Sequence, residues 1–176
     1  MKDRKSILII IGSASPQSSN LQLARIIQAR SRDTCTIIES LAHLPHFDPL
    51  QSATAAPEEV ILFRKQVEEA DGFIICTPEY VFSTPAILKN ALEWCVATTV
   101  FAQKPAGLIT ASAQGKKGHE KLQLIMQTLE ARFTKDTTLL IQGVKGKFDR
   151  EGELNDEQTA EQLQVFVSSF EDLVHA

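Results

Sequence analysis

Five short apolar segments recur along the chain, and they constrain its fold more than any other feature. They span residues 6–12, 34–40, 72–77, 106–112 and 137–143. The segments are rich in β-branched residues and mostly do not alternate with polar ones. This pattern is typical of strands that are buried on both faces of a parallel sheet. We therefore expect five parallel strands.

Helical patterns lie between these segments. Apolar residues recur at helical spacing within residues 21–28, 60–70, 87–95, 122–129 and 156–174. Strands that alternate with helices require right-handed crossovers, which place helices on both faces of the sheet. The sequence thus predicts an α/β protein, a three-layer sandwich with the flavodoxin-like strand order 2-1-3-4-5, in a single domain over residues 1–176. Residues 41–59 are expected to cross the surface as a loop.

Charge and hydropathy exclude several classes of partner. The net charge is −4, and the Lys and Arg residues are scattered without forming a stripe, so nucleic-acid binding is not expected. The apolar run of residues 7–11 is too short for a signal peptide, and no segment approaches the roughly 20 apolar residues that span a bilayer. We expect a soluble cytoplasmic protein without membrane contact.

The cysteines and histidines do not form a recognisable metal or disulfide pattern. Cys35, Cys76 and Cys95 are far apart and lack C-x-x-C spacing, so they are expected to be buried apolar side chains. His43 and His46 stand three residues apart in a predicted loop, with a proline between them and no further ligand cluster nearby. No metal site is expected.

The loop after the first strand is rich in hydroxyl and amide groups. Gly12 permits a tight turn, and five polar residues precede or open the next helix, namely Ser13, Ser15, Ser18, Ser19 and Asn20. Unpaired amides and the helix dipole at such a position favour an anion. Because the loop contains no Lys or Arg, we expect one monophosphate group. The alternative is that Ser15 with Pro16, or Ser18, merely caps the helix.

Aromatic side chains follow the third strand. Pro78, Tyr80 and Phe82 come directly after it, and aromatics at the mouth of a sheet suit a flat ring system. Alternatively, Tyr80 and Phe82 pack against a neighbouring loop or a partner subunit. Thr84, followed by Pro85, is predicted to cap the next helix.

The loop after the fourth strand combines small and basic residues. Gly115 and Gly118 would allow the backbone to approach a bound ring closely. Lys116 and Lys117 are placed to meet the phosphates of an arriving nucleotide, or else form a solvated charged turn.

Taken together, the loops resemble those of the NADPH-dependent FMN reductase family. The first loop matches the phosphate loop of the family at Gly12, Ser13, Ser18, Asn20, Leu23 and Ala24. The second matches the P-E-Y-N-x-S-x-P signature and its continuation at Pro78, Glu79, Tyr80, Ser83, Pro85, Leu88, Lys89, Asn90, Ala91 and Trp94. Residues 147–159 also resemble the stretch before the last helix of the family.

The sequence departs from the family pattern at four positions. Ser15 stands where the family frequently has Arg, Val81 where it has Asn, Ala86 where it has Gly, and Glu93 where it has Asp. The loss of the Arg removes a charge that can pair with a phosphate or with the nicotinamide nucleotide. The substitution therefore bears on FMN affinity and on the preference for NADPH.

The resemblance implies a set of residues that bind FMN. The phosphate would lie on Ser13, Ser15, Ser18, Ser19 and Asn20, and the ring along Pro78, Glu79, Tyr80, Val81 and Phe82. Ser112, Ala113 and Gly115 would border another edge of the ring. Glu79 is expected to face solvent, and Lys89, Asn90, Glu93 and Trp94 to serve packing and helix positioning.

The resemblance also implies an activity. A hydride would pass from NADPH or NADH through bound FMN to a small acceptor, which is a flavin, a quinone, an azo compound or a metal oxyanion. Because the flavin itself accepts the hydride, no catalytic side chain is assigned. Members of the family pair through the region after the third strand, so a homodimer or homotetramer is expected. The alternatives are a flavin-binding electron carrier or sensor that acts through a protein partner, and a relative that has lost flavin affinity.

Overall fold

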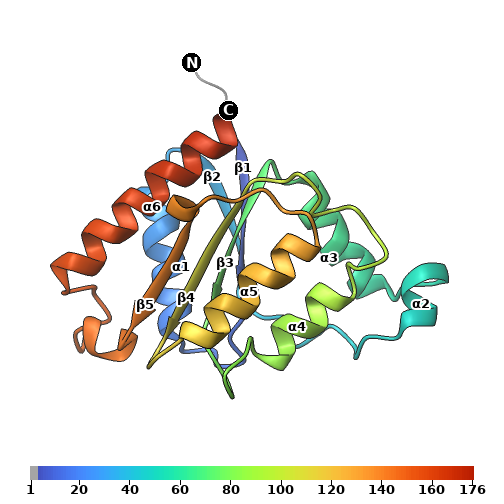
Figure 1. Cartoon of the computed structure of the whole chain (residues 1–176), viewed down its shortest axis with the longest axis horizontal. Helices are drawn as coiled ribbons and strands as arrows, with labels where there is room; N and C mark the ends of the chain where they lie inside the picture. The colour runs from blue at the N-terminus through green and yellow to red at the C-terminus, as the bar shows by residue number, and fades with distance from the viewer. Residues whose placement is uncertain (1–3) are drawn as a thin grey trace.

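The computed structural model describes residues 4–176, and its centre is one parallel sheet (Figure 1). The strands are β1 (Ser6–Ile11), β2 (Thr34–Ile38), β3 (Gly72–Thr77), β4 (Ala106–Ser112) and β5 (Thr138–Gln142). Their order in the sheet is β2-β1-β3-β4-β5, and every neighbouring pair is parallel. The predicted strand order is confirmed.

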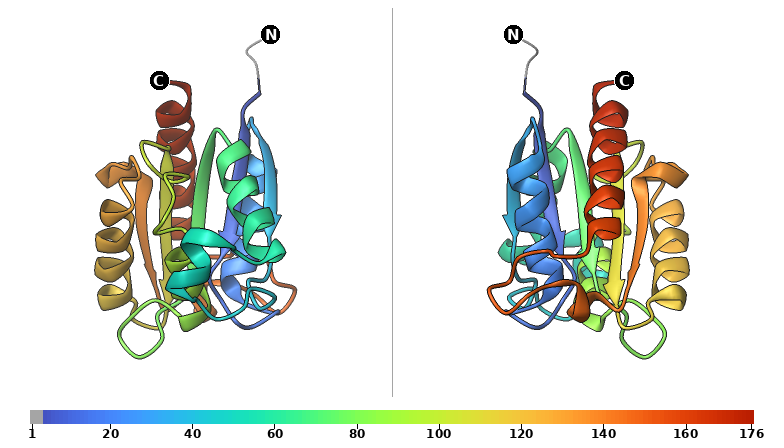
Figure 2. Two further views of the ribbon diagram at one scale, coloured as in Figure 1. Left: turned by 90° about the vertical axis from the view of Figure 1, so that its right-hand side faces the viewer. Right: turned by 90° about the vertical axis from the view of Figure 1, so that its left-hand side faces the viewer.

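Helices cover both faces of this sheet, as Figure 2 shows. One face packs against α1 (Ser19–Arg30) and α6 (Glu157–His175), and the other against α3 (Glu58–Glu69), α4 (Ala86–Glu93) and α5 (Lys116–Thr128). The three-layer α/β sandwich expected from the sequence is therefore present.

The apolar run in β1 supplies both faces of the core. Leu8 and Ile10 belong to the cluster under α3, α4 and α5, whereas Ile7, Ile9 and Ile11 belong to the cluster under α1 and α6. All five side chains are at most 4% exposed. Side chains alternate between the faces of a strand, so a strand with helices on both sides must be apolar at every position. The edge strand β2 differs from the expectation, because three of its residues are partly buried and two are exposed.

Two details of the helices differ from the sequence-based expectations. Residues 41–59 are not entirely loop, because they contain the short helix α2 (Pro49–Thr54), whose first amides are capped by the Asp48 carboxylate. Thr84 does not cap α4. Pro85 occupies the capping position, its carbonyl accepts from the amides of Leu88 and Lys89, and the helix begins one residue later than predicted.

The cysteines are largely inert. Cys76 and Cys95 are buried as expected, and this burial raises the pKa of both thiols to about 12. Cys35 is only half-buried, because it lies on the edge strand. Within residues 4–176, no helix is long and apolar enough to cross a membrane, and no three His, Cys, Asp or Glu residues are grouped to hold a metal ion.

Asp156 makes the start of α6 sensitive to acid. Hydrogen bonds from Thr159, followed by the one from Lys147, hold the pKa of its carboxyl at about 2. Because the folded pKa is depressed, this stabilisation is complete above about pH 4 and is lost as the pH falls to about 2. We expect Asp156→Ala to be less stable than the wild type in urea unfolding at pH 7. The difference should shrink over that acid range, and a constant difference would contradict this role.

Candidate functional site

A cavity of about 440 Å³ lies at the carboxyl ends of the strands. It is bounded by the segments that follow β1, β3, β4 and β5, all of which reach the lower edge of the sheet in Figure 1. Nine of the residues predicted to bind a cofactor line it, namely Ser13, Ser15, Ser18, Ser19, Asn20, Pro78, Tyr80, Ser112 and Ala113. Such a position, where strand order reverses, is where open α/β sheets bind ligands.

The first loop is held by its own polar groups. The amide of Gly12 donates to the Cys76 carbonyl at 2.9 Å, and the buried hydroxyl oxygen of Ser13 accepts from the Ser15 amide at 3.2 Å. Ser18 does cap α1, since its hydroxyl oxygen accepts from the Leu21 amide at 3.2 Å. The amides of Ser19 and Asn20 have no acceptor among residues 4–176. The capping interpretation therefore holds for Ser18, and amide donors remain at the start of α1.

Asn20 connects this loop to the middle of the sheet. Its side-chain amide donates to the carbonyl of Ala111 at the end of β4, at 3.1 Å. Its Oδ1 atom is buried, and in the described part of the chain it has no hydrogen-bond partner. A buried acceptor left unpaired is costly, so its presence in a cavity wall indicates a ligand with a donor group.

The second loop forms a tight hairpin, and only Pro78 and Tyr80 at its base line the cavity. Tyr80 and Ser83 exchange two backbone hydrogen bonds of 3.0 and 3.1 Å. At the tip, Val81 and Phe82 have φ angles of 50° and 56° and are 94% and 68% exposed. A two-residue hairpin turn of this kind has positive φ angles at both central positions, and Asn or Gly usually occupies these positions. Neither Val81 nor Phe82 lines the cavity.

Glu79 was expected to face solvent, but it does not simply do so. It is half-buried, and its Oε2 atom accepts from the amide of Gly118 in the first turn of α5 at 2.6 Å. A Cβ atom at Gly118 would lie 3.0 Å from the Glu79 Cβ, so the two backbones approach closely. Glu79 therefore joins the second and third loops outside the cavity.

The third loop contributes Ser112 and Ala113 to the cavity, but Gly115 lies outside it. Gly115 has a φ angle of 83° and caps α5, which explains a glycine there without a ligand. Lys117 forms an exposed ion pair with Glu120 at 2.8 Å, in agreement with a solvated charged turn. Burial lowers the pKa of the nearby His119, so this ring is neutral near pH 7.

Sequence reasoning missed the fourth wall of the cavity. It consists of Gly143, Val144 and Lys145, which follow β5, and Gln17 from the first loop also contributes. The Gly143 amide donates to the Ala113 carbonyl at 3.1 Å and so joins this wall to the third loop. The strand order places the end of β5 beside that of β4. The predicted strand order was therefore the signal that could have identified the residues after β5 as a wall of the cavity.

The part of α4 that matches the family signature, together with Trp94 at its end, serves packing, as expected. Asn90 accepts from the amide of Phe47 at 2.8 Å and donates to the carbonyl of Pro45 at 2.9 Å. The Trp94 indole donates to the same carbonyl at 2.8 Å, and Lys89 pairs with Glu93. Asn90 and Trp94 thus fix residues 45–47 against α4, and none of these four side chains lines the cavity.

Residues 6–145 match the family described as NADPH-dependent FMN reductase. The chain belongs to this family. It is 30% identical over 171 residues to the NADH:(hydroxy)cinnamate reductase subunit CrdA of Vibrio ruber, which covers 93% of this chain and 84% of that protein. It is 28% identical over 184 residues to a quinone reductase of Escherichia coli K12, which covers 99% of this chain and 97% of that protein.

Structural comparison agrees with the family assignment. The flavoenzyme NAD(P)H:(acceptor) oxidoreductase FerB of Paracoccus denitrificans superposes with a TM-score of 0.79 at 26% identity, over 97% of both chains. Membership of the FMN reductase family confirms the expected enzyme class, an NAD(P)H-dependent oxidoreductase that uses FMN.

The residues of this family member fit FMN on structural grounds. The unpaired Asn20 oxygen suits a hydroxyl donor, which the ribityl chain of FMN provides. The serine hydroxyls and free amides at the start of α1 suit a phosphate, because both supply donors to an anion.

Proposed function

We propose that this protein binds FMN in the cavity at the carboxyl end of the sheet and passes electrons from NADH or NADPH to a small acceptor such as a quinone or a flavin. The observation that carries the proposal is the unpaired oxygen of Asn20 beside the free amides of α1, within one cavity. The related proteins named for quinone and flavin reduction support acceptors of this class.

The chain would hold FMN through residues that follow strands of the sheet or open helix α1. Ser13, Ser15, Ser18 and Ser19 would bind the phosphate group, and Asn20 would accept from a ribityl hydroxyl. The ring would lie between Pro78 and Tyr80 on one side and Ser112 and Ala113 on the other, since these residues line the remainder of the cavity.

The side chains that line the cavity would position the cofactor and would not themselves react. The cofactor that these residues would hold would supply the redox chemistry, which is uptake of a hydride from NADH or NADPH and transfer of its two electrons, together with protons, to the acceptor. Within residues 4–176, the lining consists of serines, small apolar residues, the two amides Gln17 and Asn20, Tyr80 and Lys145, and it contains no acid, thiol or imidazole. Tyr80 is 44% exposed at the rim, which leaves one side of the site open to an incoming reactant.

The same proposal includes the assembly and location of the protein. Val81 and Phe82 expose apolar surface beside the site, and this supports burial of the hairpin tip in a homodimer or homotetramer. A cytoplasmic location follows from the supply of reduced nicotinamide nucleotides there.

Anaerobic reduction tests the proposal directly. Protein mixed with FMN and NADPH or NADH should lose the absorbance of oxidised flavin, and addition of a benzoquinone should restore it. Unchanged flavin absorbance with both nucleotides would contradict the proposed enzyme activity. Steady NADPH consumption with the quinone, in the absence of a partner protein, would exclude a role limited to carrying electrons.

The FMN affinity of a variant tests whether FMN binds in this cavity. Asn20→Ala should weaken FMN binding about fivefold, because it removes one hydrogen bond to the ligand. Asn155→Ala, which changes an exposed residue outside the cavity lining, is the matched control and should bind FMN like the wild type. Equal FMN affinities in all three proteins would place the flavin elsewhere.

A further inference from the structure

The proposed phosphate site lacks charge in its own loop. A phosphate monoester carries about −1.5 to −2 charges at pH 7. The first loop offers only neutral hydroxyls and amides, together with a helix start equivalent to about half a positive charge. A cationic side chain from another segment would therefore add more to phosphate binding than any further neutral donor.

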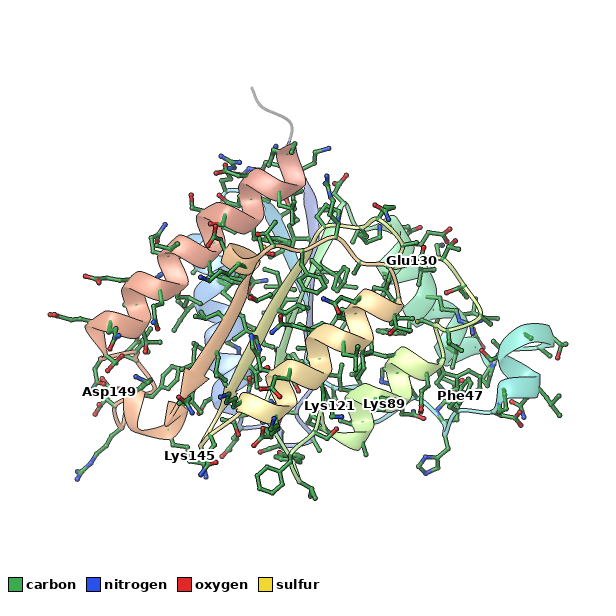
Figure 3. All side chains as sticks on the ribbon, in the orientation of Figure 1. Phe47, Lys89, Lys121, Glu130, Lys145 and Asp149 are labelled. Carbon is green, nitrogen blue, oxygen red and sulfur yellow. The ribbon has the colours of Figure 1, made fainter. Side chains whose placement is uncertain are left out.

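Among the lining residues in the described range 4–176, Lys145 carries the only charged side chain. It follows Gly143 and the buried Val144, so a short helical turn (Val144–Lys147) fixes its backbone at the cavity edge. Figure 3 shows Lys145 at the ends of β4 and β5, on the side of the sheet where the cavity loops meet. Lys145 therefore lines the cavity, and no lining residue within 4–176 carries a carboxylate that would compete for its charge.

The charge of Lys145 is not used elsewhere in residues 4–176. Its neighbour Lys147 is paired with Asp156 at 2.9 Å, and Lys117 is paired with Glu120, but Lys145 has no acidic partner within that range. Further along the chain, Gly152 lies beside the start of α1, since a Cβ atom there would lie 2.8 Å from the Gln22 side chain. The stretch from Lys145 to Gly152 therefore leads from the cavity wall to the helix whose first turn bears the free amides.

We infer that Lys145 is the cation that binds the phosphate group of FMN and so distinguishes FMN from riboflavin. This inference rests on the proposed function, because it assigns a role within the same site. The serines and amides would orient the phosphate, and Lys145 would neutralise part of its charge from the segment after β5.

The test compares two ligands that differ only in the phosphate group. In flavin fluorescence titrations at low ionic strength, Lys145→Gln should weaken FMN binding about five- to tenfold, the range between an exposed ion pair and a charged hydrogen bond. Riboflavin binding should change less than twofold. Lys121→Gln is the matched control, because it removes the same charge from the exposed side of α5, away from the cavity lining.

Salt provides a second measurement that needs only FMN. Raising sodium chloride from about 20 mM to about 500 mM should weaken FMN binding to the wild type and to Lys121→Gln, since salt screens an exposed charge pair. The Lys145→Gln variant should lose most of this dependence. Restoration of FMN affinity in the double variant Ser15→Arg with Lys145→Gln would show that a cation at the cavity is what matters, because Ser15 lines the same cavity.

The possible failures are distinguishable. If the wild type binds neither flavin, the proposed function itself is wrong. If it binds FMN but Lys145→Gln leaves both the affinity and the salt dependence unchanged, only the role of Lys145 is overturned. An equal loss of FMN and riboflavin binding would also overturn it, because that loss would not involve the phosphate.

Discussion

The Trp94→Ala variant is expected to lose about 4 kcal/mol of unfolding free energy in urea titrations. Trp94 is fully buried, its ring meets Phe47 edge to face at 5.4 Å, and its indole donates to the Pro45 carbonyl. Alanine would leave a large cavity between α4 and residues 45–47, and it would also leave that carbonyl with one donor fewer.

Trp94→Phe separates these two contributions. Phenylalanine retains much of the ring volume but cannot donate to Pro45, so a loss of about 2 kcal/mol is expected. Trp94 does not line the cavity, and FMN affinity measured on the folded protein should therefore stay within about twofold for the phenylalanine variant. Equal destabilisation by alanine and phenylalanine would contradict the argument from packing.

Gly12→Ala is expected to destabilise the protein by about 3 kcal/mol, because it overpacks the point where β1 leaves the sheet. A Cβ atom there would lie 2.5 Å from the Thr77 hydroxyl oxygen and 2.8 Å from a methyl carbon of Leu88. The Thr77 Cβ atom would also lie only 2.8 Å away, and since it is fixed to the β3 backbone, relief would require Gly12 to move away from β3. Weaker FMN binding should accompany the loss of stability.

Gly146→Ala provides the matched control for this substitution. Its Cβ atom would meet nothing within 4 Å, and the stability change should stay within about 0.5 kcal/mol. If Gly12→Ala were as stable as Gly146→Ala in the same urea titrations, the close approach of Thr77 to Gly12 would not exist in solution.

The features that were predicted correctly depend on short stretches of sequence. The apolar run of β1 and the serines that follow it identify a buried strand and the start of a helix through periodicity and capping preferences. The strand order then follows from crossover handedness, which leaves few arrangements for five parallel strands. For these reasons the first loop and its place at the sheet edge could be predicted.

The features that were missed depend on contacts between distant segments. Glu79 accepts from Gly118, which lies 39 residues later in the chain, and no local pattern indicates such a partner. Lys145 reaches the cavity because β5 lies beside β4, although its own segment carries no binding motif. Thr84 failed as a cap because Pro85 adopts an extended conformation at the position that the threonine was expected to take.

The burial of Cys76 has a consequence for the durability of an enzyme of this kind. Reduced flavins react with oxygen to give hydrogen peroxide. The residues around a flavin site are therefore exposed to peroxide that forms at that site. Peroxide attacks thiolates, and a thiol with a pKa of about 12, sealed in β3, is almost entirely protonated at neutral pH. The strand that leads to Pro78 and Tyr80 is therefore chemically protected from the side reaction of its own cofactor.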